Sequence, residues 1–127
     1  MLIVEVRDTG ETQTRNWRFT GADSFIGQML GRSWLTMRTE DLLICARWLT
    51  ISSEKKTTVI HSTGETSPAA LHAGFVEPQL VSSVQIEDGL ASWRELMTSR
   101  NAYDHIHQAV YGALRVYDLP DLKKGRR

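Results

Sequence analysis

Cysteine, net charge and long apolar runs are all scarce in this chain of 127 residues. Its one cysteine, Cys45, excludes a disulfide framework and a cysteine-rich zinc site. Cys45 lies in the apolar run 42–49, so we expect a small buried hydrophobe. No run reaches the ~18 apolar residues of a membrane helix, and the early acidic residue Glu5 does not suit a signal peptide. We therefore expect a soluble, cytoplasmic protein.

Charge of neither sign predominates. Lys plus Arg number 15 and Asp plus Glu number 15, so the formal net charge is zero. Such a chain has no electrostatic reason to bind nucleic acid or an anionic membrane. Zero net charge also leaves self-association unopposed. The length and the 41% hydrophobic content suit one domain over residues 1–127.

Strand-like and helix-like segments alternate along the chain. Short β-branched apolar runs predict strands over 2–6, 57–63 and 80–86. Helical spacing predicts one long or interrupted helix over 23–49, restarting at Thr39–Asp41 if interrupted, and further helices over 68–76, 91–97 and 103–114. The last residues, 119–127, are expected to form a loose tail. The alternation predicts a small α/β fold, with a three-stranded, mainly parallel sheet and flanking helices.

Three loops follow the predicted strands, and in parallel sheets ligands bind at that edge. They span residues 7–12, 62–67 and 87–91. The most informative is the tight strand-to-helix turn Ser62–Pro68, because Pro68 suits the first turn of a helix. Carboxylates occur in all three loops: Asp8, Glu11, Glu65, Glu87 and Asp88.

Several stretches resemble one family. Residues 7–12 (RDTGET) resemble the R-G-x-G-E-T/S turn of α/β-hydrolases in the acetylxylan-esterase-like and dienelactone-hydrolase-like branches. The chain also looks like a group of large bacterial proteins labelled as acetylxylan esterases, along stretches 30–33, 38–41, 46–49, 68–73, 77–78 and 112–122.

The resemblance implies a truncated α/β-hydrolase fold that holds the fourth to sixth of about eight strands. The nucleophile elbow would follow the strand 57–63. The family's third strand, which lies between the fourth and the fifth, is absent, so either Leu2–Val6 or another chain would fill the gap. Bare sheet edges favour pairing, so we expect a homo-oligomer, a dimer or larger, built by sheet-edge pairing or helix packing.

The elbow lacks the usual serine, because its nucleophile position falls on Gly64 or Glu65. The strands that bring the acid and the histidine of a Ser-His-Asp triad also lie beyond this chain. Glu65 could act as nucleophile or general base, or be a solvated acid near a helix N-terminus. Ser62 and Ser67 could contribute hydroxyls, although a serine before proline is often an N-cap.

Two further catalytic arrangements remain open. Glu65 and Asp88 could flank a glycosidic bond, with Trp17 and Trp93 stacking on a sugar. His105, following Asp104, could supply an acid and a base across an oligomer interface. His105 and His107 project to different sides of a helix and make a poor metal pair, and no cofactor motif is present.

Three functions therefore remain. The chain is a weak or non-standard carboxylic-ester hydrolase acting on acetyl esters of carbohydrates, with a site built by the oligomer; or a glycoside hydrolase; or a non-catalytic oligomeric binding or structural unit. Elsewhere we expect structural roles. Aromatic residues at helical spacing should form the core, namely Trp34, Trp48, Phe75 and Tyr111. The arginines of segment 23–49 should lie on a solvated, salt-bridged face, namely Arg32, Arg38 and Arg47.

Overall fold

A computed structural model of the chain describes residues 1–13, 22–98 and 108–124. The α-helices and strands are α1 (Ala22–Met29), α2 (Trp34–Ser53), β1 (Thr58–Thr63), α3 (Ser67–Val76), β2 (Val81–Glu87), α4 (Trp93–Thr98) and α5 (Leu119–Lys124). Short 3-10 turns are η1 (Gly10–Thr12), η2 (Gly64–Thr66) and η4 (Ala113–Arg115). None of the helices in these described ranges has the length and apolar character needed to span a bilayer.

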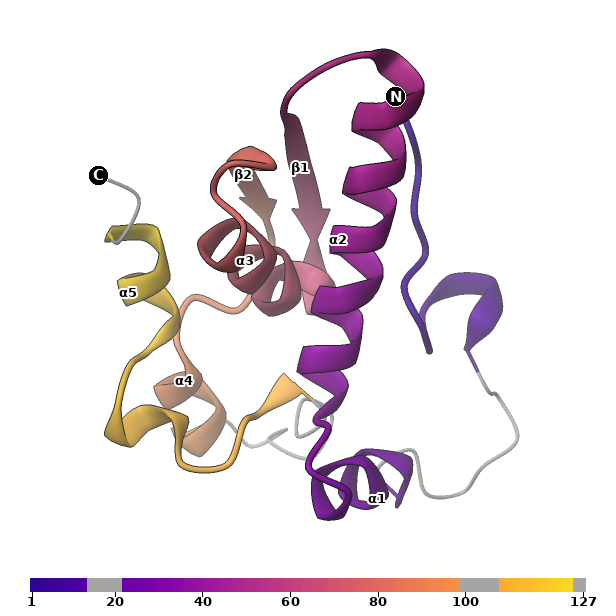
Figure 1. Cartoon of the computed structure of the whole chain (residues 1–127). Helices are drawn as coiled ribbons and strands as arrows, with labels where there is room; N and C mark the ends of the chain where they lie inside the picture. Colours follow the sequence, from indigo (N-terminus) through magenta and orange to yellow (C-terminus); the bar gives the residue numbers. More distant parts are fainter. Residues whose placement is uncertain (14–21, 99–107, 125–127) are drawn as a thin grey trace.

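The sheet consists of β1 and β2, which pair in parallel from Thr58 opposite Val81 to Thr63 opposite Glu87. Helix α3 connects them, and α2 and α3 lie on one face of the sheet (Figure 1). Thr58 and Ser62 are buried, whereas Val59 and His61, which alternate with them, are exposed. The predicted α/β class, with a parallel sheet and flanking helices, is confirmed.

Leu2–Val6 is the one predicted strand that does not join the sheet as the structure describes it, so the predicted three-stranded sheet has two strands. The segment runs nearly straight beside α2 (Figure 1). Val6 is buried, and Arg7 donates to Asp41 of α2 through Nη2 to Oδ1 at 2.6 Å and Nε to Oδ2 at 2.8 Å. Burial of Val6 and this ion pair attach the segment to the helix, so β propensity alone does not bring it to a strand edge.

The long helical stretch 23–49 is divided into α1 and α2. Gly31 follows α1 with a φ of +76°, a conformation in which a side chain would be strained. Ser33 then caps α2, its Oγ accepting a 3.1 Å hydrogen bond from the Thr36 amide. The predicted restart at Thr39–Asp41 is therefore wrong, and Thr39 lies buried inside α2.

The C-terminal residues also differ from expectation. Residues 119–124, predicted to be loose, form α5, which packs on α3 and buries Leu119 and Leu122 in the core. The predicted helix 103–114 lies outside the described residues up to 107, and 108–114 form no α-helix.

The core contains fewer of the predicted aromatic side chains than expected. Trp48, Phe75 and Tyr111 are exposed, and Trp34 is only partly buried. Trp93 instead joins the core.

Candidate functional site

The turn after β1 has the expected strand-to-helix shape. β1 ends at Thr63, Gly64 takes a φ of +58°, and α3 begins at Ser67 with Pro68 buried in its first turn. No heavy atom lies within 4 Å of the place where a Cβ on Gly64 would be. Glycine is therefore favoured here by backbone conformation rather than by lack of space.

A buried arginine joins this turn to the first loop. Arg38 of α2 is 2% exposed, and its Nε donates to the Arg7 carbonyl at 3.1 Å and its Nη2 to the Asp8 carbonyl at 3.3 Å. Nη2 also lies 3.8 Å from Glu65 Oε1. Burial lowers the pKa of Arg38, and the Glu65 carboxylate opposes that shift. The prediction that Arg38 lies on a solvated face is therefore wrong, because its guanidinium is buried against the two loops.

The third loop meets the turn at Ser67. A Cβ on Gly89 would lie 2.3 Å from Ser67 Oγ, so only glycine permits this approach. Ser67 is fully buried, and its Oγ has no hydrogen-bond partner within the described part of the chain. The three predicted loops lie together, because Arg38 joins the first to the second and Ser67 approaches the third, but the first of them follows no strand of the sheet.

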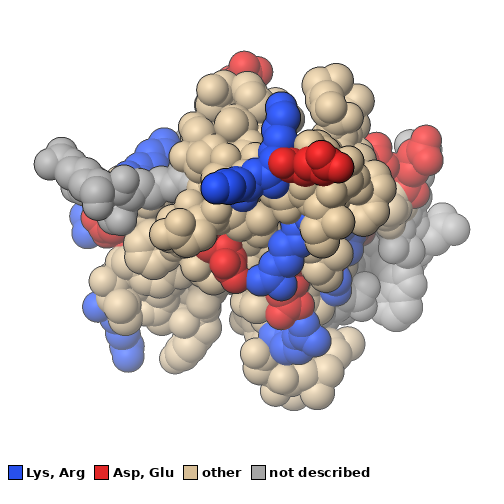
Figure 2. Space-filling view, turned by 45° about the horizontal axis from the view of Figure 1, so that its top comes forward, with Lys and Arg blue, Asp and Glu red and all other residues tan. Residues whose placement is uncertain are grey.

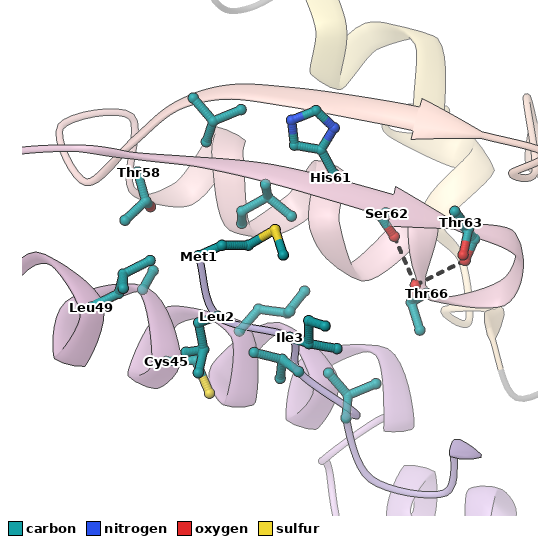
Figure 3. A pocket seen from close by; sticks show the side chains of 16 residues that line it. Met1, Leu2, Ile3, Cys45, Leu49, Thr58, His61, Ser62, Thr63 and Thr66 are labelled. Atoms are coloured by element: carbon teal, nitrogen blue, oxygen red, sulfur yellow. Dashed lines mark hydrogen bonds between the residues drawn. The ribbon is translucent and has the colours of Figure 1, made fainter.

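The candidate catalytic residues occupy different surroundings. Ser62 Oγ lies 2.7 Å from Thr66 Oγ1, which donates to the Thr63 carbonyl at 3.0 Å (Figure 3). Ser67 is not the N-cap of α3, since Thr66 holds that position. Glu65 is the ion-pair partner of Arg38. Asp88 is exposed, with a φ of +49°, in the loop after β2.

The remaining candidates do not extend this arrangement. His105, Asp104 and Trp17 lie outside the described residues. Trp93 is buried, so the expectation that it stacks on a sugar is wrong. Its ring packs 5.6 Å from His72 and 5.2 Å from Tyr117, measured between centroids.

His72 is a structural histidine in this aromatic cluster. Its Nδ1 lies 2.6 Å from the Pro68 carbonyl and its Nε2 lies 2.8 Å from the Tyr117 hydroxyl. Burial lowers the pKa of His72 and raises the pKa of Tyr117. Both ring nitrogens are therefore engaged inside the fold, as expected for a satisfied core histidine.

A hollow of about 550 Å³ follows the edge of β1 that faces away from β2 (Figure 3). We call it the β1 groove. Its walls are β1, α2 and the N-terminal segment, and Ser62 and Thr66 lie at the end nearest the turn. No lining side chain carries a full charge; the lining residues are Met1–Val4, Val6, Leu42, Cys45, Ala46, Leu49, Thr58–Thr63 and Thr66.

Charged side chains lie outside the groove. On the face seen in Figure 2, basic and acidic side chains intermingle and form no extended patch of one sign. In the ranges that the structure describes, no three His, Cys, Asp or Glu side chains are grouped so as to hold a metal ion.

Comparison with known proteins gives no relative. No family model matches the chain, and no match was found among curated proteins or among solved structures. The resemblance to α/β-hydrolases therefore stays a prediction.

Proposed function

We propose that this chain is a non-catalytic binding unit that accepts an extended peptide strand in the β1 groove. The observation that carries the proposal is a groove along the open edge of β1 that no Asp, Glu, Lys or Arg side chain lines. Within the described residues β1 has β2 as its one strand partner. The other edge of β1 therefore presents backbone N–H and C=O groups that another strand can pair with.

The groove suits a peptide better than a small apolar molecule. Its volume lies within the range of small-molecule pockets, but an apolar molecule offers no hydrogen bonds to a strand edge. An extended peptide satisfies those backbone groups, and its alternate side chains face the apolar walls formed by Leu42, Ala46 and Leu49.

The surroundings of the catalytic candidates favour binding over catalysis. Ser67 is sealed from solvent, Ser62 is hydrogen-bonded to Thr66, and Glu65 faces the guanidinium of Arg38. The interactions of Ser62 and Glu65 therefore lie within the fold. A nucleophile needs an adjacent base and access to substrate, and the described residues supply neither at Ser67.

Cys45 provides a direct test because it lines the groove and is the only cysteine. A soluble hexapeptide of alternating valine and threonine should slow alkylation of Cys45 in a saturable manner. The same peptide with N-methylated backbone amides is the matched control and should not slow it. Equal alkylation rates with both peptides, at a chain concentration where the chain sediments as a monomer, would count against strand binding. Protection by a small apolar dye, with none by the peptide, would overturn the proposal in favour of a small-molecule pocket.

Activity assays test the other half of the proposal. Short acyl esters and aryl glycosides should show no turnover above background with the intact chain. Turnover that disappears in Glu65→Gln would show that the turn is catalytic and would refute a purely binding role.

A further inference from the structure

The occupant of the β1 groove can be named more closely, on the premise that the proposed strand-binding function is right. We infer that it is residues 2–6 of a second copy of this chain. The two copies would form a two-fold dimer in which each N-terminal segment enters the groove of the other. The result is one continuous sheet across both copies.

The chemistry of the N-terminal segment matches the groove. Leu2, Ile3, Val4 and Val6 are apolar, and three of them are β-branched, as a strand favours. Ile3 is 82% exposed although it lies at the groove. The single charged residue, Glu5, is not part of the lining, and its Oε2 accepts a 2.8 Å hydrogen bond from the Glu11 amide.

The direction of the segment permits a symmetric exchange. Residues 2–6 run in roughly the same direction as β1, with the groove between them (Figures 1 and 3). A two-fold axis would place the second copy's segment antiparallel between the two. By symmetry the first copy's segment then lies in the second copy's groove, and no segment leaves its own helix α2. Such an isologous contact is closed and does not propagate into a fibre.

The resulting strand order is β2, β1, the second copy's 2–6, the first copy's own 2–6, then β1 and β2 of the second copy. At about 3.3 Å per residue, a five-residue segment spans ~17 Å and the six residues of β1 span ~20 Å, so the lengths match. The open edge of β1 and the groove-facing side of the chain's own segment 2–6 then both gain a neighbouring strand, because each inserted segment pairs on two sides.

Charge also favours a second copy over a charged partner. No Asp, Glu, Lys or Arg side chain lines the groove, and the net charge of the chain is zero, so two copies approach without repulsion between like net charges. A peptide with several charged side chains would find no oppositely charged side chain in the lining.

Sedimentation velocity of the full chain between 1 and 100 μM tests the inference. We expect a species of twice the monomer mass that is lost in Ile3→Pro, because proline removes a backbone donor from the pairing strand. Ile3→Val is the matched control and should keep the dimer. Ile3 is exposed and lies in no strand of the isolated chain, so at chain concentrations below those at which the dimer forms, Ile3→Pro should unfold like the unchanged chain.

A second variant tests the arrangement without relying on proline. In a Cys45→Ala chain, Val4→Cys should form an intermolecular disulfide on mild oxidation, because the axis passes the middle of the two paired segments and brings the two copies of residue 4 opposite one another. Tyr111→Cys, at an exposed residue outside the pairing segments, should not.

The outcomes separate this inference from the function beneath it. A monomer at 100 μM whose Cys45 is still protected by the valine–threonine peptide would overturn the dimer and keep strand binding. A dimer that survives Ile3→Pro would place the interface elsewhere and overturn the inference. A monomer without peptide protection would overturn both.

Discussion

Arg38 is the residue on which the candidate site depends most. Its guanidinium is removed from water and donates to two backbone carbonyls of the first loop, while lying beside a carboxylate of the second. It also lies 5.6 Å from the centre of the Trp34 ring. A buried charge is tolerated only where such partners compensate for lost hydration, so the two loops and α2 depend on one another.

Replacing Arg38 by methionine should therefore destabilise the fold. Methionine has roughly the volume of the aliphatic part of the arginine side chain. The carbonyls of Arg7 and Asp8, however, lose a hydrogen-bond donor, and Glu65 loses a neighbouring cation. We expect a loss of about 2–3 kcal/mol in the free energy of unfolding, measured in urea. Glu65→Gln is the comparison and should cost less than about 1 kcal/mol, because Glu65 is partly exposed. Equal losses in the two variants would contradict this account.

His72 predicts how stability depends on pH. Burial lowers its pKa in the folded state from the ordinary 6.5. Below pH 6.5 the unfolded chain therefore binds a proton that the folded chain resists, and stability falls as pH falls; above pH 6.5 this contribution is fully present. The slope from one proton is at most about 1.4 kcal/mol per pH unit. Urea unfolding between pH 5 and 7.5 should show the decline.

The matched variants for this prediction are His72→Gln and His61→Gln. His72→Gln should flatten the decline between pH 5 and 6.5, whereas exposed His61→Gln should leave it in place. A decline unchanged in His72→Gln would assign the pH dependence to another group.

At the level of elements, the sequence predicted the strands and helices whose ends are set by residues next to them in the chain. The β-branched runs placed β1 and β2 to within one residue at each end, and Pro68 placed the first turn of α3. Gly31 and Ser33 gave usable stop and start signals, but the apolar spacing that continues across them suggested a single long stretch. The spacing of apolar residues indicates which side chains are buried and does not show whether the helical backbone is continuous, so it can extend across a short break between two helices.

Other elements depend on contacts distant in sequence, which a pattern does not contain. Leu2–Val6 has the composition of a strand, but Arg7 and Asp41 attach its end to α2. Leu119 and Leu122 are three apart in a polar tail, and α3 supplies the surface that makes them a helix face.

The candidate site was predictable in outline and not in detail. Parallel strands predict that the loops after β1 and β2 share one edge. The first loop also lies there, but Arg38 of α2 holds it rather than a strand of the sheet. Arg38 was missed because a basic residue near acidic ones resembles a solvent face. Its spacing from Leu35 and Leu42, three before and four after, would have placed it on the apolar side of α2. The sequence led us to expect a bare sheet edge, but not the groove between β1, α2 and the N-terminal segment, because the groove depends on contacts between distant parts of the chain.

For the whole molecule, two different exposed surfaces could associate, an apolar stripe on α2 and the β1 groove of the proposed dimer. Ile44, Trp48 and Ile51 are spaced four and three residues apart on α2, and each is more than half exposed. None of them lines the β1 groove. Exposed apolar stripes favour association, and a chain without net charge does not oppose it. We therefore distinguish nonspecific association through this stripe from a defined dimer through the groove.

Trp48→Glu separates the two surfaces. Because Trp48 is exposed, the free energy of unfolding should change by no more than about 0.5 kcal/mol. The variant should reduce light scattering at high concentration and leave the sedimenting dimer intact. Ile3→Pro should do the reverse, removing the dimer and leaving the scattering. If Trp48→Glu instead abolished the dimer, α2 helix packing would be the interface, and the sheet edge would be free for a different strand.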